Sequence, residues 1–118
     1  MKRGEIWTVA GAKDYAGKPR PVVIIQDDRF DTTKSVTVCG FTTNPINAPL
    51  FRLPVHPTPA NGLRYLSRIM VDKINSVSRA KIGSRVGRLT DEDMVRLNRA
   101  ILVFLGIAGP APDERLPE

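Results

Sequence analysis

The sequence of 118 residues contains one cysteine and one histidine, and its 12 acidic residues are outnumbered by 18 lysines and arginines. A single cysteine, Cys39, cannot form an internal disulfide, and with one histidine it cannot supply the ligands of a structural zinc site. No apolar run approaches the roughly 20 residues that a membrane-spanning helix needs. Residues 1–7 also lack the apolar core of a secretion signal. We therefore expect a cytoplasmic protein that does not enter a membrane.

The shortage of acidic residues gives a net charge of +6, which is distributed unevenly along the chain. Residues 107–118 contain three acids and one base, so residues 1–106 hold 17 basic against 9 acidic side chains, a net charge of +8. Such an excess attracts phosphate-bearing or acidic partners over long range. The length and the 42% apolar composition suit one globular domain with a single core.

Six short segments have the composition of β-strands. Polar and apolar residues alternate around Trp7, whereas residues 21–26 form a continuous apolar run, which indicates a strand covered on both faces. The expected strands are residues 5–9, 21–26, 36–42, 51–55, 67–74 and 81–89. Cys39 falls within the third strand, where a small buried apolar side chain is favoured over a reactive thiol. Because no helical pattern separates these segments, they predict a small antiparallel barrel.

A helix is expected after the last strand. Thr90 precedes Asp93 by three residues, as in a capping box, and Gly106 supplies a C-terminal stop. Apolar residues between them recur at spacings of three and four and predict one buried stripe that caps the barrel. The predicted stripe consists of Met94, Leu97, Ile101, Leu102 and Leu105. In an alternative interpretation, Met94 and Leu102 extend toward a partner subunit and only the other three cover the barrel. Residues 108–118 are rich in proline and charge, so we expect a domain over residues 1–107 followed by a flexible tail.

One arginine stands at a constrained position. Arg20 lies between Pro19 and Pro21 at the start of the apolar strand, and the prolines favour extended backbone there. Its guanidinium fork suits a phosphate. The following strand ends in Thr42, Thr43 and Asn44, so two strand ends can present arginine and hydroxyl donors to one anion.

The ordered pattern of these pieces resembles the MazF/PemK (Kid) toxin family of bacterial toxin–antitoxin systems. The resemblance rests on residues 3–7, residues 20–25, a strand ending in residues 41–43, and a terminal helix that closes at residues 105–106. It implies a small SH3-like antiparallel barrel with a C-terminal helix, working as a homodimer. It also implies a sequence-selective mRNA interferase that cleaves single-stranded RNA without metal or cofactor and thereby inhibits translation and growth. The implied partner is an antitoxin whose flexible acidic tail covers the substrate groove, with DNA contacted only indirectly through that antitoxin.

Carried onto this sequence, the resemblance assigns catalytic roles to Arg20, Thr42 and, by a looser match, Asp14. RNA can be cleaved by its own 2′-hydroxyl, which attacks the adjacent phosphorus and leaves a cyclic phosphate and a 5′-hydroxyl. Arg20 would neutralise charge on the phosphoryl oxygens and Thr42 would donate one hydrogen bond. An arginine is a poor base at neutral pH, which leaves Asp14 or the substrate geometry for proton transfer. The residues expected to bind RNA are Lys18, Thr43, Asn44, Arg68, Lys73, Arg79, Lys81 and Arg85.

Two other functions fit the same composition. A gyrase poison of the CcdB type shares the fold, but such poisons resemble one another in a tryptophan near the C-terminus, and the only tryptophan here is Trp7. A non-catalytic, basic SH3-like module would bind nucleic acid without cutting it. Structural roles also remain open: Arg20 can pair with a nearby carboxylate, Thr42 is a good strand former, and Asp14 can be a solvated loop acid.

Overall fold

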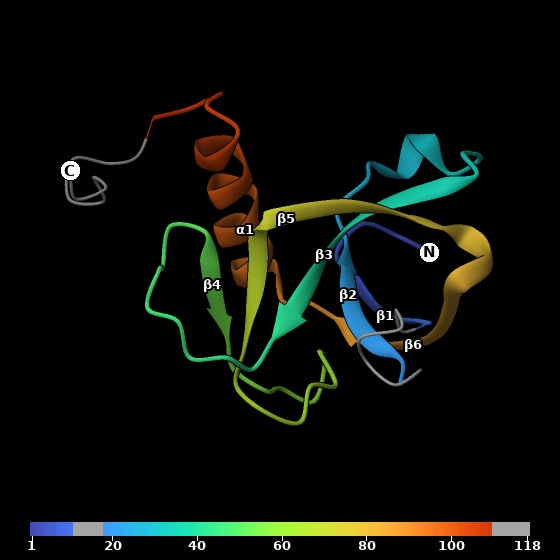
Figure 1. The fold of residues 1–118 in the computed structure, drawn as a ribbon, viewed down its shortest axis with the longest axis horizontal. Coiled ribbons are helices and arrows are strands. Elements are labelled where there is room, and N and C mark those ends of the chain that lie inside the picture. Colours follow the sequence, from blue (N-terminus) through green and yellow to red (C-terminus); the bar gives the residue numbers. More distant parts are fainter. Residues whose placement is uncertain (11–17, 110–118) are drawn as a thin grey trace.

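Six strands and one C-terminal helix make up the fold, which a computed structural model describes for residues 1–10 and 18–109 (Figure 1). The strands are β1 (Glu5–Val9), β2 (Arg20–Ile24), β3 (Ser35–Thr42), β4 (Arg52–Val55), β5 (Ser67–Ser78) and β6 (Ile82–Arg88). Two short 3-10 turns, η2 (Asp28–Phe30) and η3 (Arg79–Lys81), precede β3 and β6, and the helix α1 spans Asp91–Phe104. The prediction of a mostly β domain with a C-terminal helix is confirmed.

The strands form one antiparallel sheet in the order β4-β5-β3-β2-β1-β6. β5 is the longest strand, because it continues past the predicted end at Ile74 to Ser78. Its pairing with β3 shifts register between Cys39 and Phe41, and such irregularities bend a sheet. In Figure 1 the far end of β5 sweeps across the molecule and turns through η3 into β6, which returns to β1.

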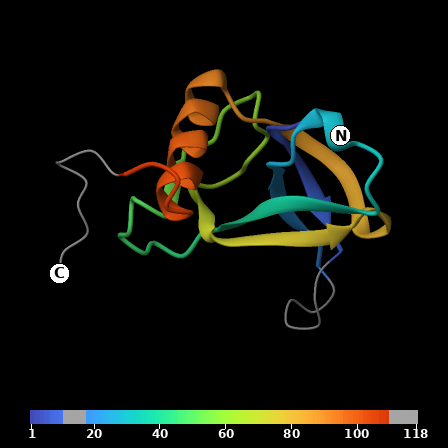
Figure 2. The same ribbon diagram turned by 90° about the horizontal axis from the view of Figure 1, so that it is seen from above.

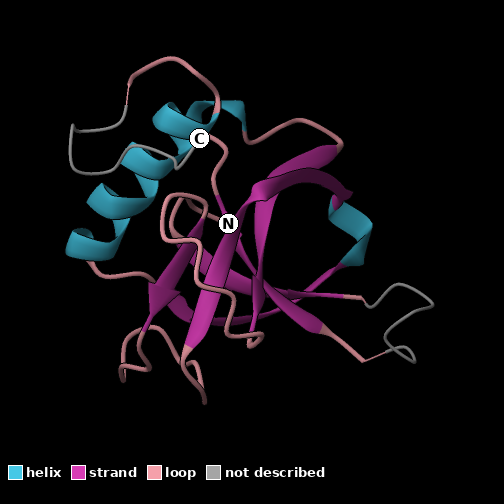
Figure 3. Cartoon of the chain, turned by 60° about the vertical axis from the view of Figure 1, so that its left-hand side comes forward, coloured by secondary structure: helices cyan, strands magenta, loops and turns pink. Residues whose placement is uncertain are grey.

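Apolar side chains pack on both faces of this sheet. One cluster lies beneath α1 and includes Val23, and Figures 2 and 3 show the helix to one side of the strands. A second cluster lies on the outer face, away from the helix, and includes Val22 and Ile24 from the same strand. The three residues are 0%, 7% and 2% exposed, in that order. Both faces of β2 are therefore covered, as its continuous apolar run predicted.

The two ends of α1 match the predicted signals. The hydroxyl of Thr90 accepts a hydrogen bond of 3.1 Å from the backbone N–H of Asp93. At the other end, Gly106 has a φ of +75°, its N–H donates to the carbonyl of Val103, and the N–H of Ile107 donates to the carbonyl of Leu102. These two bonds form a Schellman motif, which requires a residue in the left-handed region.

Two of the five residues in the predicted apolar stripe of α1 are exposed. Leu97 and Ala100 are buried, and Met94 and Ile101 are partly buried against the same cluster. Leu102 and Leu105, however, are 41% and 54% exposed. At about 100° per residue, Leu102 lies about 140° around the helix from Leu97, and Leu105 is the C-cap beyond the last turn. The buried face is therefore narrower than the spacing of apolar residues suggested.

Three further expectations concern a membrane-spanning helix, the C-terminal tail and Cys39. Within residues 1–10 and 18–109, no helix is long and apolar enough to cross a membrane. The tail predicted over residues 108–118 falls almost wholly outside the described residues, so the domain boundary at residue 107 stays a prediction. Cys39 is fully buried, and burial raises the pKa of its thiol to about 12, as expected of an apolar packing residue.

Candidate functional site

An open groove of about 890 Å³ lies on the outer face of the sheet. Part of the second apolar cluster lines this groove, through Val9, Val22 and Val38, together with Val77 packed against them. Strands β1, β2, β3 and β5 contribute most of the lining, together with the segment that follows β3. The polar and charged lining residues are Arg20, Thr42, Thr43, Asn44, Arg52, Ser67, Lys73, Asn75, Ser76, Ser78 and Lys81.

Arg20 and Thr42 come together at one end of this groove. Arg20 is the first residue of β2 and Thr42 is the last residue of β3. The register that pairs Val22 with Gly40, continued for two residues, sets Arg20 opposite Thr42. Thr42 in turn pairs with Arg68 on β5. Since paired residues project from the same face of a sheet, the three side chains form one row across the strand ends.

The hydroxyl of Thr42 is held by its own turn. The backbone N–H of Asn44 donates a hydrogen bond of 3.1 Å to the hydroxyl oxygen. A threonine hydroxyl that accepts one hydrogen bond keeps its own proton for donation. Thr42 is partly buried, whereas Thr43 and Asn44 are exposed along the groove edge. The arrangement fixes a hydrogen-bond donor at the end of β3, on the strand next to the one that Arg20 begins.

Three of the predicted lysines lie at or near the groove. Lys73 on β5 and Lys81 at the end of η3 are exposed and line it. Lys18 is exposed and precedes Arg20 by two residues. The groove therefore carries positive charge at the Arg20 end and along the β5 side, as a polyanion-binding surface requires. Asp14 lies outside the described residues.

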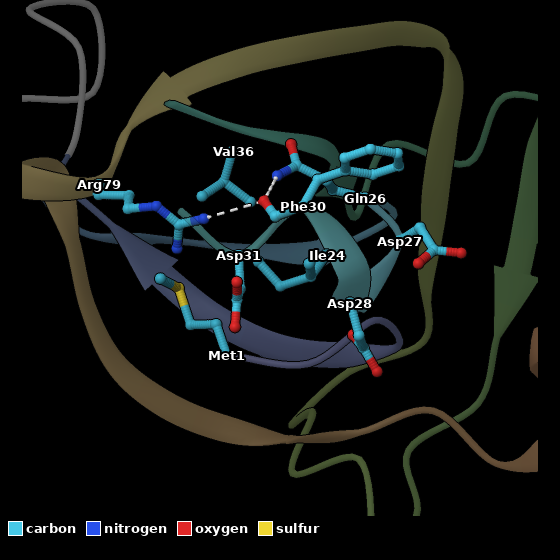
Figure 4. Close-up of a pocket in the computed structure, with 9 residues that line it drawn as sticks. All are labelled: Met1, Ile24, Gln26, Asp27, Asp28, Phe30, Asp31, Val36 and Arg79. Carbon is cyan, nitrogen blue, oxygen red and sulfur yellow. Dashed lines mark hydrogen bonds between the residues drawn. The ribbon is translucent and has the colours of Figure 1, made fainter. Parts of the chain in front are cut away.

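Arg79 does not line the groove and instead stabilises the turn before β3. Its guanidinium donates to the carbonyl oxygen of Thr33 and, at 3.5 Å, to that of Phe30. Figure 4 shows the Phe30 carbonyl receiving Arg79 from one side and Gln26 from the other. Residues 46 positions apart are thereby joined across the end of β5. The Arg79 guanidinium is therefore held by two backbone carbonyls and by the Thr33 hydroxyl.

Arg85 also lies outside the groove lining. It forms an ion pair with Glu5 on the neighbouring strand. The distance from its Nε to the Glu5 carboxylate is 3.0 Å. Burial tends to raise the pKa of Glu5, but hydrogen bonds from the Lys2 backbone, Arg85 and Trp7 outweigh it and lower the pKa. Arg85 therefore has a cross-strand partner in β1 that lies 80 residues away in the sequence.

The sequence analysis missed an ion pair in the groove wall. Arg52 on β4 donates from Nε and Nη2 to the two carboxylate oxygens of Asp72 on β5, at 2.7 and 3.0 Å. The hydrogen bonds from Arg52 lower the pKa of Asp72, and the carboxylate raises the pKa of Arg52. Arg52 is only 8% exposed, yet it lines the groove. No local sequence signal joins two residues 20 positions apart, and only the β4–β5 pairing reveals them.

A small single domain with an open, cation-lined groove on one face of a bent sheet is typical of proteins that bind nucleic acid. The family model of PemK-like, MazF-like toxins of type II toxin–antitoxin systems matches residues 2–105. The chain therefore belongs to this toxin family. The resemblance inferred from the arginine-led strand and the terminal helix is confirmed.

Individual relatives agree with this assignment. The chain is 59% identical over 109 residues to a probable endoribonuclease MazF of Mycolicibacterium smegmatis, covering 92% of this chain and all of the relative. It is 26% identical over 115 residues to the endoribonuclease MazF of Staphylococcus saprophyticus, covering 91% of this chain and 92% of the relative.

Solved structures share the fold. An endoribonuclease from a mycobacterial species, in complex with its cognate antitoxin, superposes with a TM-score of 0.74 at 22% identity, covering 93% of this chain and 99% of that one. The Mycobacterium tuberculosis toxin MazF-mt6 superposes with a TM-score of 0.72 at 24% identity, covering 86% of this chain and 96% of the other. The predicted small antiparallel barrel with a C-terminal helix is thus the fold of this family.

Proposed function

We propose that the chain is an endoribonuclease that cleaves single-stranded RNA in the groove at short recurrent sequences. One observation carries the proposal: Arg20 and Thr42 lie at adjacent strand ends in the same open groove. The relative that is 59% identical is a probable endoribonuclease, which supports the same activity for this chain.

The chemistry that these residues support is internal transesterification. The ribose 2′-hydroxyl attacks the adjacent phosphorus, the bond to the 5′-oxygen breaks, and a 2′,3′-cyclic phosphate and a 5′-hydroxyl result. The Arg20 guanidinium stays charged at every relevant pH and binds the non-bridging oxygens as their charge grows. The Thr42 hydroxyl adds one oriented donor to the same phosphate. Asp14 remains our candidate for proton transfer, with alignment of the substrate itself as the alternative.

Backbone contacts would hold the RNA on either side of the scissile phosphate. Lys73 and Lys81 provide cations along the β5 side, and Lys18 provides one beside Arg20. Thr43 and Asn44 offer hydroxyl and amide groups at the groove edge. Arg68 belongs to the same row as Thr42 and extends the cationic end. We do not propose Arg79 and Arg85 as RNA contacts, because each is bound within the fold.

The cation-lined groove also indicates which partners the chain would bind. A groove that binds a polyanion also suits an acidic peptide, so we propose that the flexible acidic tail of a cognate antitoxin covers it. A mycobacterial structural relative is itself in complex with its cognate antitoxin. We further propose that the chain acts in the cytoplasm as a homodimer that aligns two such grooves and contacts DNA only through the antitoxin.

The test is cleavage of a long single-stranded RNA in excess EDTA by the wild-type protein and by Arg20→Ala. The proposal expects cuts at a short recurrent sequence with 5′-hydroxyl ends, and a loss of about 100-fold or more in rate in the variant. Circular dichroism and thermal melting check that the variant remains folded. Full activity of a folded Arg20→Ala protein would remove Arg20 from the mechanism. A wild-type protein that binds RNA but leaves it intact would point to a binding module, and inhibition of gyrase would point to a gyrase poison.

A further inference from the structure

A glycine, Gly40, lies in the middle of β3 at the register shift between Cys39 and Phe41. Gly40 is not among the glycines with positive φ, which in the described residues are Gly4, Gly62 and Gly106. Glycine in a strand interior is destabilising by roughly 0.5–1 kcal/mol relative to alanine. It commonly marks a bulge, as the register shift here indicates, or a close approach by another group or a ligand. An ideal Cβ at residue 40 would stand 3.0 Å from the terminal methyl group of Met70 and would fill part of the groove.

The missing side chain leaves a hollow with apolar walls. Val22 pairs with Gly40 from β2, Met70 approaches from β5, and all three residues line the groove. Gly40 and Val22 stand two residues along their strands from Thr42 and Arg20, a distance of about 7 Å. An apolar hollow beside a phosphate-binding row fits a planar ring attached to the neighbouring nucleotide. The methionine thioether is a favourable contact for such a ring.

Arg52 adds one polar edge to this hollow. It pairs with Met70 across β4 and β5, so both side chains project from the groove face. Its Nε and Nη2 are bound to Asp72, which fixes the guanidinium plane. Nη1 donates to no described residue, and no described side-chain nitrogen or oxygen is both buried and unpartnered. Nη1 therefore reaches the groove as an oriented donor.

A guanidinium can donate hydrogen bonds but cannot accept them. A base that turns its O4 or O6 edge toward Nη1 must therefore present an acceptor there, which uracil does with O4 and guanine with O6. At the same position cytosine and adenine carry an exocyclic amino group, which would set donor against donor. A base that covers Nη1 without offering an acceptor also displaces the water bound there, and the loss of that hydrogen bond strengthens the discrimination.

We propose that the hollow formed by Val22, Gly40 and Met70 is a nucleobase subsite beside the scissile phosphate, in which Arg52 faces the O4 or O6 edge of the base and thereby selects a keto base, uracil or guanine. This inference rests on the proposed function, because it takes single-stranded RNA as the ligand of the groove. Asp72 acts as a positioning residue, since it holds the guanidinium without touching the base. The subsite thus couples a structural ion pair to base choice.

The experiment is a binding selection from randomised single-stranded hexamers in which every ribose is 2′-O-methylated, so that the attacking hydroxyl is blocked. We expect the wild-type protein to enrich uracil or guanine at one position. Arg52→Gln should reduce that enrichment about fivefold or more while leaving the preferences at other positions unchanged. The matched control is Arg96→Gln, because Arg96 also pairs with a carboxylate, Asp93, but does not line the groove. This control should retain the wild-type preferences.

Two further variants keep the test decisive if Arg52→Gln fails to fold. Arg52→Gln combined with Asp72→Asn replaces the ion pair by an amide pair and leaves no unpaired carboxylate. Gly40→Ala places a methyl group against the flexible end of Met70, which can shift, and should weaken selection at the same single position. Thermal melting identifies the folded variants.

The outcomes separate this inference from the proposed function. Unchanged preferences in folded Arg52 variants, or an equal loss at every position, would overturn the keto-base subsite. Absence of any selection by the wild-type protein would overturn it as well. Failure of the wild-type protein to cleave unmodified RNA would count against the nuclease proposal, while a keto preference lost with Arg52 would still establish the subsite.

Discussion

The backbone N–H of Asn44 donates a 3.1 Å hydrogen bond to the hydroxyl oxygen of Thr42, and this bond orients the hydroxyl at the end of β3. The geometry separates two functions of one side chain. The oxygen organises the turn, and the hydroxyl proton remains available to a phosphate. Substitutions at residue 42 can therefore distinguish a donor from a simple strand former.

Thr42→Val should slow RNA cleavage by about 10- to 100-fold, because valine keeps the shape and removes the donor. Thr42→Ser should stay close to the wild type, since it restores the hydroxyl. Single-turnover cleavage of one defined RNA measures both rates, with thermal melting as the check on folding. Equal rates for the wild type and Thr42→Val would show that no donor is needed at this position.

Lys81→Ala should weaken RNA binding at every sequence and reduce the salt dependence of affinity. For single strands, the slope of log affinity against log salt changes by about 0.7 for each phosphate contact removed. Arg85→Ala is the matched control, because Arg85 faces Glu5 outside the groove. Fluorescence anisotropy with a labelled, 2′-O-methylated oligonucleotide between 50 and 300 mM salt, about the range over which such slopes are resolved, provides the measurement. A larger change in slope for Arg85→Ala than for Lys81→Ala would contradict the groove assignment.

The Arg52–Asp72 pair should make folding stability depend on acid pH. Hydrogen bonds from Arg52 hold the pKa of Asp72 below its ordinary value in the folded state. The unfolded state therefore takes up a proton more readily, so the stabilisation is present above the unfolded pKa, about 3.9, and is lost as pH falls through the lower folded pKa. Urea unfolding at several pH values between 7 and 2 should show this loss. Asp72→Asn should lower stability at neutral pH and flatten the acid dependence. An unchanged profile would mean that the pair contributes nothing to it.

Gly106→Ala should destabilise the domain by about 1 kcal/mol, because the φ of +75° places an L-residue in the left-handed region. The space around Gly106 is open, so the cost is that of the backbone and not of a clash. Gly109→Ala is the matched control, since Gly109 is equally open but lacks the positive φ. Chemical unfolding of both variants gives the comparison. An equal effect at the two positions would argue against the Schellman motif as the source of stability.

Local signals were enough to predict most elements of the fold. The apolar run of β2 indicated burial on both faces because its residues alternate between two clusters, Val23 facing the helix and Val22 and Ile24 facing outward. The helix was bounded by Thr90 and Gly106, whose effects act within one turn of the chain. The width of the buried face of α1 could not be predicted from local sequence, because it depends on how much of the helix surface packs against the sheet. For this reason Leu105 was assigned to the wrong side, and the sequence left Leu102 open between the barrel and a partner subunit.

In the candidate site, too, local sequence signals predicted some residues and could not predict others. Arg20 and Thr42 were selected from the sequence because prolines and hydroxyls mark the ends of neighbouring strands. The Arg52–Asp72 pair and the hollow at Gly40 depend on cross-strand register, which includes a shift between Cys39 and Phe41. The partners of Arg79 and Arg85 lie 46 and 80 residues away, so sequence alone treated these arginines as available cations.

The position of β2 has a consequence for inhibition. This strand pairs with β1 on one side and β3 on the other, and both of its faces are covered. Moving Arg20 would require breaking two rows of backbone hydrogen bonds and exposing side chains from both apolar clusters. Local unfolding at this strand therefore approaches the cost of unfolding the whole domain. A ligand that inhibits through Arg20 therefore has to bind over the arginine in its folded position. When that ligand dissociates, the candidate site is already assembled and no refolding step is needed.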